Sequence, residues 1–307
     1  MSTLLPPAVI AFALPVVLFL TFWALCYRPL RGLVHVVKTG IKGASARLLN
    51  SRMGKWSFGH SGTVGSYAPM LLVVAVGGAA ALGAGYLFVV LSEQITVITS
   101  AVYHTDQAVH TWFGNERQPA ITTLFTAATN LGSTIGLGAI VAVAGGTLLA
   151  RKERASAVFI VVTAAVGALL NLGLKLIFAR ARPDLASAIA VARWYSFPSG
   201  HAMDSFIAFG ALGYVELRQP WPWVAKSAGL ALALTTMVLI GVSRVYLGVH
   251  WASDIAAGWS AGTVWVASAV VAFEMVLHLR ARRRGAAPAS PAVDVPDKPV
   301  PARPSTT

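Results

Sequence analysis

The stretch ASAVFIVVTAAVGALLNLGLKLIFA, residues 155–179, decides the fold class, because Lys175 is the only charged residue in its length. A helix needs about 20 mostly apolar residues to cross the hydrocarbon core of a bilayer. Similar runs occur along the rest of the chain, at residues 7–27, 69–91, 133–150, 201–217, 224–246 and 252–278. The sequence therefore predicts an all-α, polytopic transmembrane helical bundle.

The composition of the 307-residue chain excludes several other classes of protein. Charged residues make up 11% of the chain, well below the ~25% of typical soluble domains. Hydrophobic residues make up 56%, whereas disorder requires low hydrophobicity and high charge. Cys26 is the only cysteine, so no disulfide can form within the chain.

The apolar runs divide into a core and two flanking parts. Residues 69–279 contain six of the seven runs. Residues 1–68 add one N-terminal transmembrane helix and a basic connector, and this charge order is the reverse of that in a signal peptide. Residues 280–307 are basic and rich in proline and alanine, which predicts a disordered tail. Within the core, the early part of the mixed stretch 92–132 is expected to be an amphipathic segment at the membrane surface.

The few charges sum to +13, and their placement predicts how the chain lies in the membrane. Of the 24 Lys and Arg residues, 18 fall in segments on one side of the predicted topology: 28–68, 151–154, 218–226 and 280–307. Positive residues mark the cytoplasmic side, so the N-terminus is expected outside and the C-terminal tail in the cytoplasm. No nucleic-acid partner is expected. Six cations remain on the outer side: Arg117, Lys175, Arg180, Arg182, Arg193 and Arg244.

The first of three polar clusters on the outer side contains Asn171, Lys175 and the pair Arg182-Pro183. At about 100° per residue, the three polar side chains fall on one stripe of a continuing helix. Pro183 disfavours helical geometry at Arg182, so the stripe should lead into a loop. A lysine in a membrane helix usually faces a cavity or a partner. The alternative is that Lys175 snorkels from the helix end to the interface.

The second cluster, Phe197-Pro198-Ser199-Gly200-His201, opens the apolar run 201–217. Pro, Ser and Gly at a helix start leave backbone N–H groups that, together with the helix dipole, can bind an anion. His201 would then lie beside that anion. An ordinary helix cap with an interfacial histidine is the alternative. Asp204, three residues further on, either lies near His201 or is a solvated first-turn acid.

The third cluster is Ser243-Arg244, followed by His250 and Asp254. The i,i+4 spacing places His250 and Asp254 on one face of the final helix. A carboxylate at this position can accept a hydrogen bond from one imidazole nitrogen and leave the other as a base or nucleophile. The alternative is a single structural ion pair at a helix N-terminus.

Together the clusters bring cations, neutral donors and two histidines to one outer pocket. Lys175, Arg182 and Arg244 would repel one another unless an anion normally occupied this pocket. Phosphate fits best, because its transfer depends mainly on positioning and electrostatic stabilisation. Cations would repel a metal ion, and neither an HExxH nor a paired-cysteine pattern occurs, so no metal and no other cofactor is expected.

The three clusters resemble the three-part motif of the type 2 phosphatidic acid phosphatase superfamily, which includes lipid phosphate phosphatases and is related to vanadium haloperoxidases. The matching elements are Lys175-(six residues)-Arg182-Pro183, Pro198-Ser199-Gly200-His201 and Ser243-Arg244-(five residues)-His250-(three residues)-Asp254. The resemblance covers residues 69–279 as a six-helix phosphatase core. The first helix and its connector lie outside it.

The resemblance implies a role for each matched residue. His250 would be the nucleophile that forms a phosphohistidine, Asp254 would orient it, and His201 would protonate the leaving group. Water would then hydrolyse the phosphohistidine without a metal. Arg180 and Arg193 lie outside the motif and are interpreted as solvated loop charges, the alternative being that they help to attract anionic substrates. The phosphoryl oxygens would be held by Lys175, Arg182, Ser199, Gly200 and Arg244.

The expected function is that of a lipid phosphatase in a bacterial inner membrane, with its site facing the periplasm. The candidate substrates are undecaprenyl pyrophosphate, phosphatidylglycerol phosphate, phosphatidic acid and lipid A phosphate. A lipid or sugar hydroxyl acting in place of water would make the chain a phosphotransferase. An anion or lipid transporter would use the same cations at the membrane midplane, but the clusters lie near one surface and no internal repeat occurs.

Overall fold

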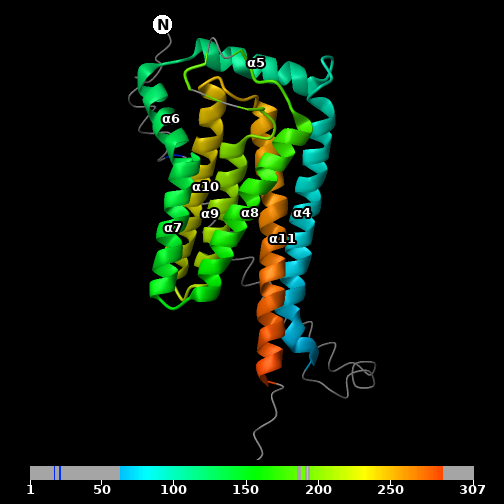
Figure 1. Ribbon diagram of the computed structural model, residues 1–307, viewed down its shortest axis with the longest axis vertical. Coiled ribbons are helices and arrows are strands. Elements are labelled where there is room, and N and C mark those ends of the chain that lie inside the picture. Colours follow the sequence, from blue (N-terminus) through cyan, green and yellow to red (C-terminus); the bar gives the residue numbers. More distant parts are fainter. Residues whose placement is uncertain are drawn as a thin grey trace, which may run out of the picture.

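The computed structural model describes residues 63–184, 188–190, 192 and 194–285, together with residues 17 and 21. Over these residues the chain forms helices and no strand (Figure 1). The helices are α4 (Thr63–Gln94), α5 (Ala101–Asn115), α6 (Pro119–Leu131), α7 (Thr134–Ala150), α8 (Arg154–Phe178), α9 (Gly200–Arg218), α10 (Trp223–Tyr246) and α11 (Ala252–Gly285). Apart from residues 17 and 21, the predicted N-terminal helix at 7–27 lies outside the described residues, as does the chain beyond 285.

The helices follow the apolar runs of the sequence. Each of the six runs between residues 69 and 278 falls within one helix, to within one residue at the ends of the run, so the prediction of an all-α, polytopic bundle is confirmed. Among the residues that the structure describes, four helices are long and apolar enough to cross a membrane, namely α4, α8, α10 and α11. The pair α6 and α7, bent by 56° at a short break, makes a fifth candidate.

Helix α9 is less apolar than these spans because it is enclosed by protein. It packs against α8, α10 and α11. Ala202, Ile207 and Ala211 are among the side chains that it buries in these contacts. A helix that meets other helices on most sides does not need the uniformly apolar surface that lipid requires. Its polar first turn can therefore be placed inside the bundle.

Helix α5 lies across one end of the bundle (Figure 1), and we call this end the α5 end. It begins at Ser100, whose side chain accepts a hydrogen bond from the Tyr103 backbone N–H. This placement agrees with the expected surface segment in the early part of 92–132. Helix α6 occupies the later part, and its bend into α7 contains Gly132. A side chain at Gly132 would overlap with Ile240 of α10, so glycine allows the bend to pack there.

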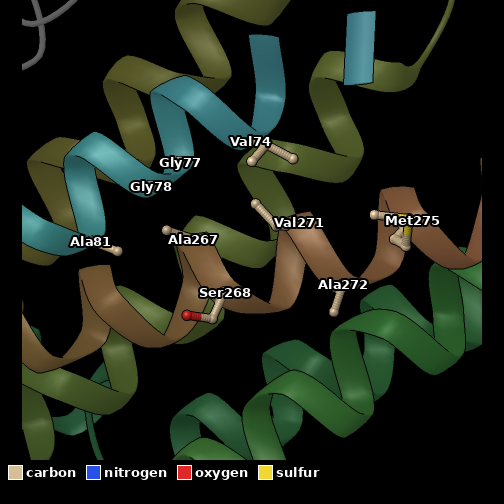
Figure 2. A pocket seen from close by; sticks show the side chains of 9 residues that line it. All are labelled: Val74, Gly77, Gly78, Ala81, Ala267, Ser268, Val271, Ala272 and Met275. Carbon is tan, nitrogen blue, oxygen red and sulfur yellow. The ribbon is translucent and has the colours of Figure 1, made fainter. Parts of the chain in front are cut away.

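Helices α4 and α11 lie side by side and extend beyond the other helices at the opposite end (Figure 1). A groove of about 410 Å³ runs between them, lined by small and apolar residues that include Gly77, Gly78 and Ala267 (Figure 2). None of the residues in the three polar clusters lines this groove. The candidate site must therefore be sought at the α5 end.

Candidate active site

The three polar clusters meet at the α5 end because two helices end there and two begin there. Helices α8 and α10 end there, with Lys175 and Arg244 in their last turns. Helices α9 and α11 begin at the same end. Their first turns are joined by a hydrogen bond, which the Ser199 N–H donates to the Asp254 backbone carbonyl (3.0 Å). Segments separated by about 80 residues are thus joined into one site.

In the first cluster, the helix ends before Arg182, as the position of Pro183 predicted. Helix α8 ends at Phe178, and Ala179 adopts a left-handed conformation with φ of 44°. Lys175 turns inward, because its Nζ donates to the carbonyl oxygens of Pro198 (2.7 Å) and Tyr195 (3.0 Å). These contacts favour a site residue over a snorkelling lysine. They also tie the end of α8 to the loop that precedes α9.

The second cluster forms the start of α9, with Ser199 in the N-cap position and Gly200 as the first helical residue. Ser199 is fully buried, and its Oγ makes no hydrogen bond to any described residue. A methyl group at Gly200 would lie 3.7 Å from Lys175 Cε, so glycine keeps the space beside the lysine open. Free N–H groups at a helix start, with an unpaired hydroxyl and a cation, suit an anionic group.

The third cluster holds the His250 imidazole between two partners. Its Nδ1 lies 3.1 Å from Asp254 Oδ2, and the same oxygen accepts the Trp251 N–H (3.0 Å). His250 is not on the final helix, contrary to the prediction, because α11 begins only at Ala252. The contact with Asp254 still forms across the helix start.

The other imidazole nitrogen, Nε2, lies 3.0 Å from Arg182 Nη1. A guanidinium group can only donate hydrogen bonds, so Nε2 must be the acceptor and carry the lone pair. Nδ1 then carries the proton that it donates to Asp254. Two neighbours of opposite charge thus select the tautomer whose lone pair is on Nε2.

His250 is also kept neutral by its surroundings. The side chain is 2% exposed. Burial lowers the pKa of His250 well below its usual value, and the nearby guanidinium of Arg182 lowers this pKa further. A neutral imidazole is the form that can act as a nucleophile.

Arg244 and His201 lie at the border between the site and α6. Arg244 is 5% exposed, and its Nη1 donates to Thr129 Oγ1 of α6 (2.6 Å). The Nε of Arg244 is buried without a hydrogen-bond partner among the described residues. Both side chains line a cavity of about 400 Å³ together with residues of α6 and of the loop before α9.

The interpretation of Arg180 as a solvated loop charge is wrong. Arg180 is 8% exposed, and it donates to Asp254 Oδ1 (2.6 Å) and to Asp106 Oδ2 of α5 (2.8 Å). Ser253 completes the network, because its N–H donates to Asp106 Oδ1 (2.9 Å). Arg193, the other cation with that interpretation, lies outside the described residues.

Asp204 also lies away from bulk solvent. Its Oδ1 is buried and makes no hydrogen bond to a described residue. Its other oxygen would lie 3.7 Å from a methyl group at Gly200, on the side that faces the first turn of α9. The alternative of a solvated first-turn acid is therefore wrong.

The arrangement suits transfer of a phosphoryl group. A neutral imidazole with an unprotonated Nε2 is surrounded by the cations of Lys175, Arg182 and Arg244, and by the start of a helix. Such a set can attract an anion, orient it and stabilise the charge of its equatorial oxygens. Within the described residues, no group of three or more His, Cys, Asp or Glu side chains is placed to hold a metal ion.

Comparisons with known proteins agree with the motifs. The sequence model of the PAP2 superfamily matches residues 156–277, a range that contains every motif residue. Phosphatidylglycerophosphatase B of Bacillus subtilis is 30% identical over 177 residues, which cover 57% of this chain and 85% of that protein. An undecaprenyl-diphosphatase of Sulfolobus acidocaldarius is 38% identical over 80 residues, 26% of this chain and 34% of that protein.

The arrangement of the helices is shared with a solved structure. The crystal structure of a transmembrane PAP2-type phosphatidylglycerolphosphate phosphatase from Bacillus subtilis matches with a TM-score of 0.58 and 29% identity. The match covers 64% of this chain and 96% of that protein. Nearly the whole of the solved structure thus has a counterpart here.

Proposed function

Because the chain belongs to the PAP2 superfamily, we propose that it is an integral membrane phosphatase that hydrolyses a lipid phosphate or a polyprenyl pyrophosphate. Two similar proteins named above are a phosphatidylglycerophosphatase and an undecaprenyl-diphosphatase, and both names describe removal of phosphate from a lipid. The observation that carries the proposal is the His250 imidazole, held neutral and oriented between Asp254 and Arg182.

In the proposed first step, His250 Nε2 attacks the phosphorus atom. An N–P bond forms as the bond from phosphorus to the leaving oxygen breaks, and His201 donates a proton to that oxygen. Asp254 stabilises the positive charge that develops on the imidazole. Lys175, Arg182, Ser199, Gly200 and Arg244 hold the phosphoryl oxygens. In the second step, water attacks the phosphohistidine, a P–O bond forms as the N–P bond breaks, and the proton of the water passes to His201 as inorganic phosphate is released.

Arg182 has two tasks in this scheme. Without a substrate it donates to His250 Nε2 and to the backbone carbonyls of Trp194 (2.9 Å) and Val249 (2.7 Å). These carbonyls hold the guanidinium beside the nucleophile. When a phosphate enters, the N–H group that faces Nε2 can turn to a phosphoryl oxygen, which frees the lone pair.

We also propose that the reaction needs no metal and that the site faces the outside. Three cations around the nucleophile supply the positive charge that a metal would otherwise provide, and they would repel a divalent ion. The outward orientation is supported by basic residues gathered at the opposite end of the described helices: Arg151, Lys152, Arg154, Arg218, Lys226 and Arg280.

The test is phosphate release by purified, detergent-solubilised protein with a chelator present. His250→Ala should abolish release, whereas His104→Ala, on the exposed face of α5, should keep the wild-type rate. Rapid acid-free quenching with labelled substrate should trap an acid-labile phosphoprotein in the wild type and none in His250→Ala. Full activity of His250→Ala would overturn the mechanism, and loss of wild-type activity in chelator would overturn metal independence.

A further inference from the structure

Helices α8 and α11 enclose a groove that lies apart from the candidate active site, and we call it the α8–α11 groove. Its volume is about 610 Å³, and no residue assigned to the proposed mechanism lines it. Val158 and Val162 of α8 form part of its wall and are 60% and 51% exposed, so the groove is open along its side. Both helices are long and apolar enough to span a membrane, and the opening therefore faces lipid.

The α8–α11 groove is charged at one end and apolar along its length. Arg154, the first residue of α8, and Arg280, near the end of α11, lie at its mouth, at the end opposite to α5, and both are exposed. Deeper in the groove, Phe159 and Trp265 form the wall. The Trp265 Nε1–H donates to the Thr163 carbonyl (2.8 Å), so the indole ring offers only apolar surface to the groove.

The apolar part of the groove is about as deep as one leaflet of a bilayer. Nine residues of α8 separate Arg154 from Thr163, a rise of about 13 Å. On α11, 15 residues separate Arg280 from Trp265, a rise of about 22 Å. The hydrocarbon of one leaflet is roughly 15 Å thick, half of the bilayer core. An acyl chain whose headgroup stayed beside the arginines would therefore fit along the groove.

The two arginines at the mouth are not compensated by acidic side chains. Neither Arg154 nor Arg280 forms a salt bridge with a carboxylate of the described residues. Glu153, next to Arg154 in the chain, instead accepts from the side-chain amide that follows α9 (2.9 Å). Glu274 of α11 is paired with Arg218 of α9. The guanidinium groups thus remain available to an external anion, and their forked geometry suits a phosphate.

The start of α8 adds to the attraction for an anion at this mouth. Its N-cap residue, Glu153, makes no side-chain hydrogen bond to the first turn, and Ala155 in that turn lines the groove. The first N–H groups of a helix have no acceptor within the helix, and the helix dipole favours negative charge beside them. The backbone and the two side chains therefore favour the same kind of group.

We infer that the α8–α11 groove binds an anionic phospholipid from the leaflet at the end opposite to α5. Its phosphate lies between Arg154 and Arg280, and one acyl chain follows the groove past Phe159 to Trp265. Basic pockets between membrane helices bind anionic headgroups in this way. The quaternary ammonium of phosphatidylcholine would meet two cations, so phosphatidylglycerol should bind more tightly. This lipid is a bound partner and not a substrate, because it lies at the opposite end from His250.

The experiment uses Trp265 as the reporter of an acyl chain in the groove. Purified protein in detergent is titrated with phosphatidylglycerol or phosphatidylcholine carrying bromine on the acyl chain, which quenches an indole on contact. The difference between the wild type and Trp265→Phe isolates this residue from the other tryptophans. We expect half-maximal quenching at an about tenfold lower concentration of phosphatidylglycerol than of phosphatidylcholine.

Two sets of variants separate the headgroup contact from general charge. The double variant Arg154→Gln/Arg280→Gln should lose the preference for phosphatidylglycerol. The matched control is Arg151→Gln/Lys152→Gln, which removes the same charge from exposed residues at the same end that do not line the groove, and it should keep the preference. Val158→Phe, one turn after Arg154, narrows the groove and should weaken quenching by both lipids. Thermal unfolding in detergent checks that each variant is folded.

Three results would overturn the inference. The first is equal quenching by the two lipids in the wild type. The second is an equal loss of preference in the control pair, which would show a general effect of surface charge. The third is weaker quenching in Val158→Phe with no effect of the arginine pair, which would show a groove for the chains of any lipid. Because the readout is binding at a place outside the active site, none of these results depends on the proposed function.

Discussion

At the scale of single residues, Asp254 is the point where the separate parts of the site are joined. One carboxylate oxygen faces His250, the other faces Arg180, and the backbone carbonyl accepts the N–H of Ser199. The residue therefore links the proposed nucleophile, a buried cation and the start of α9. Its side chain is fully buried, so no water competes for these contacts.

The environment of His250 leads to a prediction about pH. Burial and Arg182 lower the pKa of His250 well below its usual value of about 6.5. Its imidazole should therefore stay neutral as the pH falls from about 8 through 6.5. Selective ¹⁵N-histidine labelling can follow this in detergent, with the His250 resonance assigned by its loss in His250→Ala. A titration midpoint near the ordinary value would contradict the prediction.

The same shift has a consequence for stability. The unfolded chain binds a proton at His250 as the pH falls through about 6.5, whereas the folded chain does not until a lower pH. Because the unfolded state then holds more protons, the contribution of this group to folding stability decreases as the pH falls below that value. Above it, the contribution is fully present.

The buried contact between Arg180 and Asp106 predicts a positioning effect on catalysis. Asp106→Asn keeps the side-chain size and removes one of the two carboxylates that hold Arg180. The Arg180 guanidinium then has Asp254 as its only carboxylate partner among the described residues, which should displace the Asp254 side chain. A displaced Asp254 would in turn misorient His250. We expect kcat to fall by roughly 10²-fold, with KM nearly unchanged, because Asp106 contacts no group assigned to the substrate.

Steady-state kinetics on the preferred lipid separate the two constants. Glu116→Gln is the control, since this carboxylate follows α5 directly but is exposed. A wild-type kcat in Asp106→Asn would show that Asp254 holds its position without α5. An increase in KM alone would indicate a role in binding.

Motif spacing indicated most of the candidate site but not this network. Lys175, Arg182 and the His250–Asp254 pair are recognisable because their separations along the chain are short and regular. Arg180 is only two residues from Arg182, yet its partner Asp106 is 74 positions away on a surface helix. No local pattern connects the two, so the sequence alone predicts a solvated charge. Only the packing of α5 over the bundle brings them together.

At the scale of elements, the bend between α6 and α7 determines how close α6 comes to the site. Gly132→Ala would place a methyl group against Ile240 and 3.2 Å from His201 Cδ2. We expect a loss of about 1–3 kcal/mol in unfolding free energy from overpacking. A reduced kcat should accompany it, because His201 is displaced.

A matched substitution on the neighbouring helix separates crowding from the change of residue type. Gly138 of α7 has no other group within 4 Å of an added methyl, so Gly138→Ala should leave both stability and kcat at or slightly above wild type. Unfolding in detergent and phosphate release provide the two readouts. Equal behaviour of the two alanine variants would contradict the role of the bend.

The hydropathy of the sequence predicted helices better than it predicted their connections. Long apolar runs identify α4, α7, α8, α10 and α11 because lipid contact demands them. No apolar run marks helix α6, since its polar face interrupts the apolar pattern where it borders the cavity. The apolar run from 252 matches the start of α11, but the prediction that His250 lies on this helix is wrong, because its i,i+4 contact with Asp254 forms without His250 being helical.

At the scale of the whole molecule, the uneven distribution of charge predicts the orientation in the membrane. The α5 end is proposed to face the outside and the α7–α8 turn the cytoplasm. In a Cys26→Ser background, cysteines introduced at Trp112 of α5 and at Lys152 of the turn report the two sides, since both positions are exposed. A membrane-impermeant maleimide should label position 112 in intact cells and position 152 only after permeabilisation. The reverse pattern would invert the proposed topology.

The contact from α5 to the buried arginine sets a condition for transplanting this site to another protein. The three motifs occupy a continuous part of the chain, from Lys175 to Asp254, and could be moved as one block. Such a block would carry Arg180 but leave behind the carboxylate of Asp106, which comes from a helix 69 residues before the first motif residue. A recipient scaffold would then hold a desolvated guanidinium with half of its charge compensation missing. An engineer who borrows the chemistry must therefore also supply an acidic group on the covering layer.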